Sequence, residues 1–134
     1  MKYMLAIFGE EGGWDDVSPA EMQEGIELWG AYEEDLKASG GYVAGEGLQP
    51  SATATTVKVP EGGGERIVTD GPFTESKEQL GGFYLLECKD LDHALEWARK
   101  VPVRAGSIEV RPVMDYEAAG YEGPTSEEAA AARS

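Results

Sequence analysis

Histidine and cysteine are nearly absent from this sequence, which holds one of each. Cys88 has no partner for a disulfide within the chain, which favours a reducing, cytoplasmic setting. The remaining candidate ligands are carboxylates that are scattered along the chain, and their spacing does not match that of a metal site. The sequence therefore predicts no metal site, and no motif in it calls for a cofactor.

Positive charge is also scarce. Eleven lysine and arginine residues face 26 aspartate and glutamate residues, which gives a formal net charge of −15. Nucleic acids and acidic membrane surfaces are bound through clustered Lys and Arg, and no basic run occurs here. The apolar run at residues 1–8 is too short for a signal segment or a membrane span. We therefore expect neither a nucleic-acid partner nor a membrane partner.

What the sequence does contain is a regular alternation of short strands and helices. Its 134 residues suit one domain, which can bury about two-thirds of its unfolded surface. The first strand, expected over residues 3–8, is apolar on both faces, so both faces need a cover. Its residues alternate as Tyr3, Leu5 and Ile7 against Met4, Ala6 and Phe8.

Two helices are marked by their starting residues. Ser18-Pro19-Ala20-Glu21 reads as a capping box with proline at the first helical position, and Gly40-Gly41 ends that helix. The second helix starts at residues 90–92 and stops before Pro102. The buried stripe of the first helix is predicted to hold Met22, Ile26, Trp29 and Leu36, flanked by Leu28 and Tyr32. That of the second is predicted to hold Leu91, Ala94, Leu95 and Ala98.

Further strands are expected at 42–48, 83–88 and 107–113, with a hairpin at 54–59 and 65–69 around a glycine-rich turn. The order is an α+β, ferredoxin-like split βαβ pattern with an inserted hairpin. Two helices cover one face of such a sheet, and a symmetric homodimer would cover the other. Residues 1–116 are predicted to form this domain. Residues 117–134, acidic and alanine-rich, are predicted to form a flexible tail with little core.

Several segments resemble one family in order and spacing. They are Lys2-Tyr3-Met4-Leu5, residues 43–48 with Pro50, Thr69-Asp70-Gly71-Pro72-Phe73, residues 75–83 and Glu109-Val110-Arg111-Pro112. Over about residues 1–113, the chain resembles the DGPF branch of the YCII-related family. The resemblance implies a dimeric αβ-barrel and a small enzyme or ligand-binding protein that uses a His–Asp pair. It also implies that some relatives occur with extracytoplasmic-function sigma factors.

The chain departs from this pattern at the histidine. Aligning the first helix with that of the family puts Trp29 near the position of the histidine, and no imidazole lies there. The only histidine, His93, lies in the first turn of the second helix, where we interpret it as a surface residue. Acid–base catalysis by a His–Asp pair is therefore in doubt.

Asp70 is the candidate catalytic residue, since it matches the aspartate of the family motif and follows a strand. The alternative is that its carboxylate caps the Asp-Gly-Pro turn. Lys77 and Glu78 follow closely and are candidate ligand-binding residues, with solvated loop charges as the alternative. Arg111 is a candidate for a substrate carboxylate, or it pairs with a glutamate such as Glu109 or Glu87.

Trp29 and Tyr32 are candidates for an apolar ligand pocket between helix and sheet, and otherwise belong to the core. Two functions from different classes remain open. One is a small-molecule-binding protein, or an enzyme, with a cleft near the Asp-Gly-Pro-Phe loop. The other is a non-catalytic regulatory or protein-interaction module linked to transcription through sigma factors, whose acidic surface would meet a basic partner.

Overall fold

A computed structural model describes residues 1–10, 17–73, 77–121 and 131. Along the chain, the elements are β1 (Lys2–Glu10), α1 (Pro19–Ala38), β2 (Tyr42–Gly47), the short 3-10 helix η1 (Ser51–Thr53), β3 (Thr55–Lys58), β4 (Ile67–Asp70), β5 (Glu78–Glu87), α2 (Leu91–Arg99) and β6 (Gly106–Pro112). Four strands form an antiparallel sheet in the order β2-β5-β1-β6. The fold is α+β, as predicted, and this strand order is compatible with the ferredoxin-like split βαβ pattern.

Both helices begin where the sequence predicts. Ser18 Oγ accepts a hydrogen bond from the Glu21 amide at 3.2 Å, and Pro19 is the first helical residue of α1. Asp90 Oδ1 accepts a hydrogen bond from the His93 amide at 2.8 Å and caps α2 in the same way. Each cap satisfies one of the amides that a helix start leaves unpaired.

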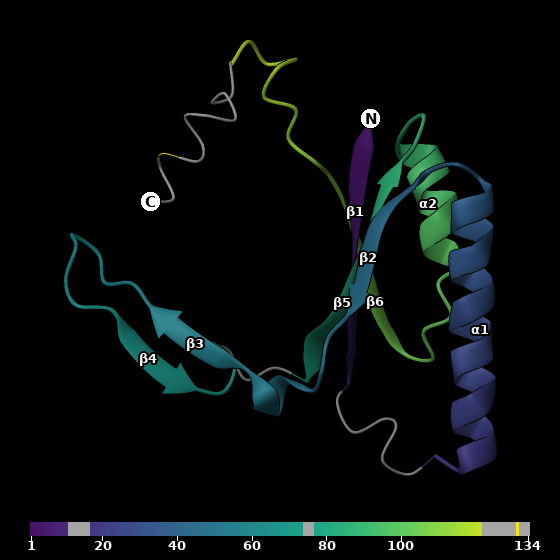
Figure 1. Ribbon diagram of the computed structural model, residues 1–134, viewed down its shortest axis with the longest axis horizontal. Coiled ribbons are helices and arrows are strands. Elements are labelled where there is room, and N and C mark those ends of the chain that lie inside the picture. The colour runs from purple at the N-terminus through teal and green to yellow at the C-terminus, as the bar shows by residue number, and fades with distance from the viewer. Residues whose placement is uncertain (11–16, 74–76, 122–130, 132–134) are drawn as a thin grey trace.

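The core lies between the helices and one face of the sheet. Figure 1 shows α1 and α2 on the same side of the four strands. Leu5, Leu36 and Leu86 are at most 1% exposed, and full burial of each such side chain contributes about 1.5–3 kcal/mol. Tyr32 packs edge-to-face on Tyr84, with ring centroids 5.5 Å apart. This face is therefore a complete, close-packed core within one chain.

Ile26 and Leu91 of the predicted buried stripes, and Leu28 beside the first stripe, are exposed, so their predicted burial was wrong. Ile26 is 58% exposed, Leu28 54% and Leu91 48%. The buried face of α1 is centred on Tyr32 and Leu36, and Ile26 lies about a quarter of a turn from that line. Figure 1 shows α2 beside the C-terminal part of α1, so the N-terminal part has less to pack against.

The fifth strand also starts earlier than predicted, at Glu78 instead of residue 83. The Gly81-Gly82 pair therefore lies within the strand. A Cβ on Gly82 would lie 2.8 Å from the carbonyl oxygen of Glu46, so the close approach of β2 requires a glycine. A register shift between Ile7 and Phe8 of β1 marks a β-bulge at the same end of the sheet.

The predicted hairpin is confirmed as a separate two-stranded sheet of β3 and β4. Its base is held by the Gly71 amide, which donates to the Ala54 carbonyl at 2.7 Å. Close by in the chain, the Leu48 amide donates to the Gly81 carbonyl of β5 at 2.8 Å. The base of the hairpin therefore lies at the end of the sheet where β5 begins. Figure 1 shows the hairpin projecting on the side opposite the helices.

In the part of the chain that is described, no helix has the length and apolar character needed to cross a membrane. Most of the predicted tail, residues 117–134, lies outside the described residues. Its described start, residues 117–121, continues from β6 as a turn in which the Tyr121 amide donates to the Tyr116 carbonyl at 2.8 Å.

Candidate functional site

The sheet face opposite the helices carries an apolar band along β1 and β5. The register places Met4, Ala6 and Phe8 of β1 opposite Leu85, Phe83 and Leu80 of β5, and directly opposed residues point to the same face. On the other side of β1, the register between β1 and β6 places three β6 residues on this face: Arg111, Glu109 and Ser107. Figure 1 shows that neither helix covers it. We call this surface the open face.

A hollow of about 530 Å³ lies at one end of the open face. The register shift after Ile7 and the adjacent pair Gly9 and Gly106 lie at this end of β1. β-bulges re-aim neighbouring side chains, and glycines leave space beside them. The hollow is lined by the apolar residues Phe8, Leu80 and Ile108 and the polar residues Glu78, Gln79, Ser107 and Glu109.

The polar groups of the hollow are tied to one another. Ser107 Oγ donates a hydrogen bond to Glu78 Oε2 at 3.2 Å, which joins β6 to β5 across β1. Arg111 Nη2 forms an ion pair with Glu109 Oε1 on the same strand. Both of these side chains are about half or more exposed, so the pair contributes little to stability. The hollow therefore combines carboxylate oxygens and a hydroxyl group, which Glu78 orients, with the apolar side chains of its lining.

Two of the predicted site residues belong to this arrangement. Glu78 lines the hollow directly, and Arg111 is bound to the lining residue Glu109. The alternative for Arg111 was that it pairs with a glutamate. The structure shows this pairing, with Glu109 of the same strand. Chemically, the arrangement can accept hydrogen bonds from a bound molecule and bury its apolar part.

Asp70 is the last residue of β4 and is exposed. Its side chain forms no hydrogen bond or ion pair with the rest of the described chain, and the turn is held instead by Gly71 and Thr56. The Gly71 amide donates to Ala54, and Thr56 Oγ1 donates to the Gly71 carbonyl at 2.7 Å. Gly71 has a φ of +98°, a value that favours glycine. The catalytic role of Asp70 stays a prediction.

Lys77 is exposed immediately before β5, and within the described residues it forms no ion pair. It lies next to Glu78 in the chain, so it is near the hollow without lining it. Its ligand-binding role also stays a prediction.

Trp29 and Tyr32 lie on α1, on the other side of the sheet from the hollow (Figure 1). Trp29 is half-buried against the core, and Tyr32 is buried within it. The Tyr32 hydroxyl donates to the Trp97 carbonyl at 2.9 Å. Burial, together with the neighbouring Tyr84 and Cys88, raises the pKa of Tyr32. The structure therefore separates these two residues from Glu78 and Arg111, and their part in a ligand pocket stays a prediction.

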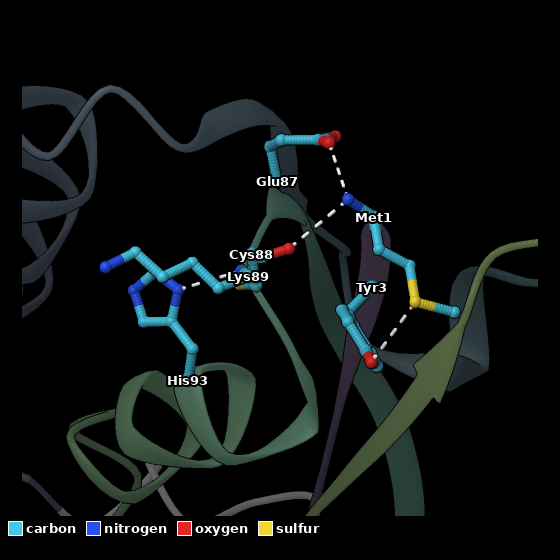
Figure 2. Close-up of polar contacts among 6 residues, drawn as sticks. All are labelled: Met1, Tyr3, Glu87, Cys88, Lys89 and His93. Carbon is cyan, nitrogen blue, oxygen red and sulfur yellow. Dashed lines mark hydrogen bonds and ion pairs between the residues drawn. The ribbon is translucent and has the colours of Figure 1, made fainter.

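The single histidine lies in the first turn of α2, close to where the chain leaves the C-terminal end of β5 (Figure 2). Its Nδ1 accepts a hydrogen bond from the Lys89 amide at 3.1 Å, just after the C-terminal end of β5. The hollow lies at the N-terminal end of β5, and ten strand residues span about 30 Å. Beside His93, the Met1 amino group binds Glu87 Oε1 at 2.7 Å and the Cys88 carbonyl. His93 thus helps to hold the start of α2 and supplies no imidazole to the hollow.

Sequence reasoning missed several lining residues, notably Phe8, Leu80 and Ser107. The alternation of β1 put Phe8 on the uncovered face, which was a usable signal. The early start of β5 and the pairing of Ser107 with Glu78 depend on the register between strands that are distant in sequence. In the described part of the chain, no group of three metal-ligating side chains gathers at one place.

Two comparisons place the chain among known proteins. The YCII-related domain family matches residues 1–117. An uncharacterized protein of Rhizobium meliloti (strain 1021) is 48% identical over 73 residues, which cover 52% of this chain and 57% of that protein. The chain thus spans little more than half the length of this relative. Because the family match covers most of its length, the chain belongs to the YCII-related domain family.

Proposed function

We propose that the protein is a homodimeric small-molecule-binding protein, with its ligand in the hollow at the Phe8 end of the open face. The observation that carries this proposal is the hollow itself, whose volume of about 530 Å³ suits a small organic ligand. Its lining combines an apolar floor with a few convergent polar groups, which is the usual composition of such sites. We expect a ligand with an apolar ring or chain and a hydrogen-bonding head group.

The homodimer belongs to the same proposal, as a dimeric αβ-barrel of the DGPF branch. The apolar band of the open face, which includes Met4, Phe83 and Leu85, supports it, because these side chains are only partly buried within one chain and no helix covers them. A two-fold axis would bring the two open faces together in one isologous contact. The hollow would then lie at the edge of the interface, where two chains can enclose a ligand.

Chemistry on the bound molecule would fall to Asp70. The Asp-Gly-Pro-Phe loop lies at the base of the hairpin, at the end of the sheet that holds the hollow. An exposed carboxylate there is available to act as an acid, a base or a charge partner. Lys77 lies between this loop and Glu78, and it is the candidate cation of the site.

A second candidate is a regulatory protein-interaction module linked to transcription. The exposed apolar side chains of the hairpin favour it, since Val57, Ile67 and Val68 are each more than half exposed. This function needs no ligand in the hollow, which separates it from the first proposal.

The test is binding of the neutral fluorescent probe N-phenyl-1-naphthylamine, which has an apolar body and one amine donor. We expect saturable binding of one probe per chain, lost in Ser107→Trp because the indole fills the hollow. Ala31→Trp is the matched control, since Ala31 is exposed on α1 on the other side of the sheet. Circular dichroism checks that both variants fold, and Leu80→Trp provides a second way to fill the hollow. Equal binding by all three variants and the wild type would overturn the proposed site.

A further inference from the structure

The hairpin of β3 and β4 presents an apolar surface with no cover in the described part of its own chain. The exposed fractions are 52% for Val57, 61% for Val59, 55% for Ile67 and 76% for Phe73. β3 and β4 pair only with each other. An isolated two-stranded hairpin is marginal in water and usually gains its stability by packing on another surface. The hairpin therefore needs a partner surface.

One cation lies within this apolar surface. Lys58 lines a groove of about 470 Å³ on the hairpin together with Val57, Val59, Pro60, Ile67 and Phe73. It forms no ion pair in the described chain. A surface of this kind fits an apolar surface that carries negative charge.

The hollow on the open face has that complementary character. Its charged lining residues are Glu78 and Glu109, set beside the apolar side chains of Phe8 and Leu80. Glu109 pairs with Arg111, and Glu78 accepts a hydrogen bond from the hydroxyl of Ser107. A carboxylate can accept from several donors at once, so Glu78 can also receive a cation from outside the chain. The lining of the hairpin groove and the lining of the hollow thus match in apolar character, and the charges that they carry are opposite.

The two surfaces of one chain do not meet. No hairpin residue lines the hollow, and no residue of β1, β5 or β6 lines the hairpin groove. Figure 1 shows the hairpin projecting away from the sheet, on the side of the open face. A two-fold axis through paired open faces would send each hairpin towards the other chain, so two identical contacts would form at once.

We infer that the hairpin of each chain docks on the hollow of a second copy, with Lys58 facing Glu78 of that copy. The ligand site is then completed in trans, with the apolar residues of the hairpin closing the mouth of the hollow. This inference rests on the proposed homodimer. It goes further by naming the surface that each copy contributes and the charge pair that fixes the register.

The test mixes two charge-reversed forms of the full chain, Lys58→Glu and Glu78→Lys. Each form alone places like charges at both contacts of its dimer, two carboxylates in the first form and two ammonium groups in the second. A dimer with one chain of each form has opposite charges at both contacts. If docking occurs in trans, native mass spectrometry should find mixed dimers as roughly four-fifths or more of the population instead of the statistical half.

Other outcomes are equally decisive. Statistical mixing of dimers would overturn the inference and leave the homodimer standing. The apolar surface of the hairpin would then be covered by contact within one chain or by a different protein partner. A wild type that is monomeric would overturn the homodimer itself. Because Lys58 and Glu78 are both exposed, we expect the variants to fold. Glu78→Arg is a second partner for Lys58→Glu if Glu78→Lys does not fold.

Discussion

The two faces of the four-stranded sheet carry similar apolar residues but are completed in different ways. Under the helices, Leu5, Leu36 and Leu86 are almost fully buried within one chain. On the open face, Phe83 and Leu85 are only half-buried and Leu80 is 42% exposed. The alternation of β1 supplies both faces, yet only one has helices over it. The difference indicates that the covered face makes the fold, and it supports our proposal that the open face serves binding.

The polar groups of the two faces also differ in their burial. Tyr32 and Tyr84 lie on the covered side, where burial raises the pKa of Tyr84 to about 12 and that of Tyr32 further still. Titratable groups of the open face, among them Glu78, Glu109 and Arg111, are exposed to solvent. Charges that can meet a ligand or a second copy are thus kept on one face only.

The sharpest way to break this comparison is to place the same charge on each face in turn. Leu5→Asp puts a carboxylate at a fully buried position of the covered face, and a buried unpaired charge costs several kcal/mol. We expect the variant to be unfolded at room temperature, with no cooperative melt by circular dichroism. A native-like melt would mean that this face is not the main core.

Leu85→Asp places the same charge on the open face. Since Leu85 is half-buried there, the carboxylate can reach water in a single chain, and we expect a folded chain with a somewhat lower Tm. In the proposed dimer the two charges would lie in the interface, so the dimer should dissociate, as measured by light scattering at micromolar concentration. A folded Leu85→Asp dimer would refute the pairing of open faces.

Tyr32→Phe tests a polar contact of the covered face. Loss of the hydroxyl leaves the Trp97 carbonyl without this donor and should cost about 1 kcal/mol, which corresponds to a fall in Tm of about 5 °C. The raised pKa of folded Tyr32 means that the unfolded chain loses its proton first as pH rises. Wild-type stability should therefore fall above pH 10, the ordinary value for tyrosine, and this fall should be shallower in Tyr32→Phe.

A smaller stability effect is expected at Asp70. Its carboxylate forms no hydrogen bond with the described residues, so Asp70→Asn should shift the Tm by less than about 2 °C. If Asp70 serves a bound molecule, a screen of small molecules by Tm shift should find compounds that stabilise the wild type and not Asp70→Asn. Strong destabilisation would show instead that the carboxylate holds the turn, and equal shifts would remove it from the site.

Local signals in the sequence predicted much of the fold. Ser18 and Asp90 marked the starts of both helices, and the alternation of residues 3–8 identified a strand that is apolar on both faces. Ile26 failed because its exposure depends on how α1 is rotated against the sheet, which its own spacing does not determine. The sequence did not predict that β5 begins at Glu78, because glycines usually mark turns. Here the glycines lie within the strand and let β2 approach closely.

The candidate site was less predictable than the fold. Glu78 and Arg111 were predicted as ligand-binding residues and lie at or beside the hollow, but their neighbours Phe8 and Ser107 come together only through the register of three strands. Trp29 and Tyr32 were weighed as pocket or core from their aromatic character, and α1 places them on the covered side. The local pattern of the sequence shows which residues alternate along a strand. Only the pairing of strands that are distant in sequence shows which of these residues line the hollow.

Sedimentation equilibrium of the full wild-type chain at micromolar concentration tests most directly whether the open face is a binding surface. The expected result is a single species of twice the 14.4 kDa chain mass, with dissociation to single chains in Leu85→Asp and not in Ala31→Trp. A wild type that stays at 14.4 kDa throughout would contradict the pairing of open faces and, with it, the completion of the hollow by a second copy.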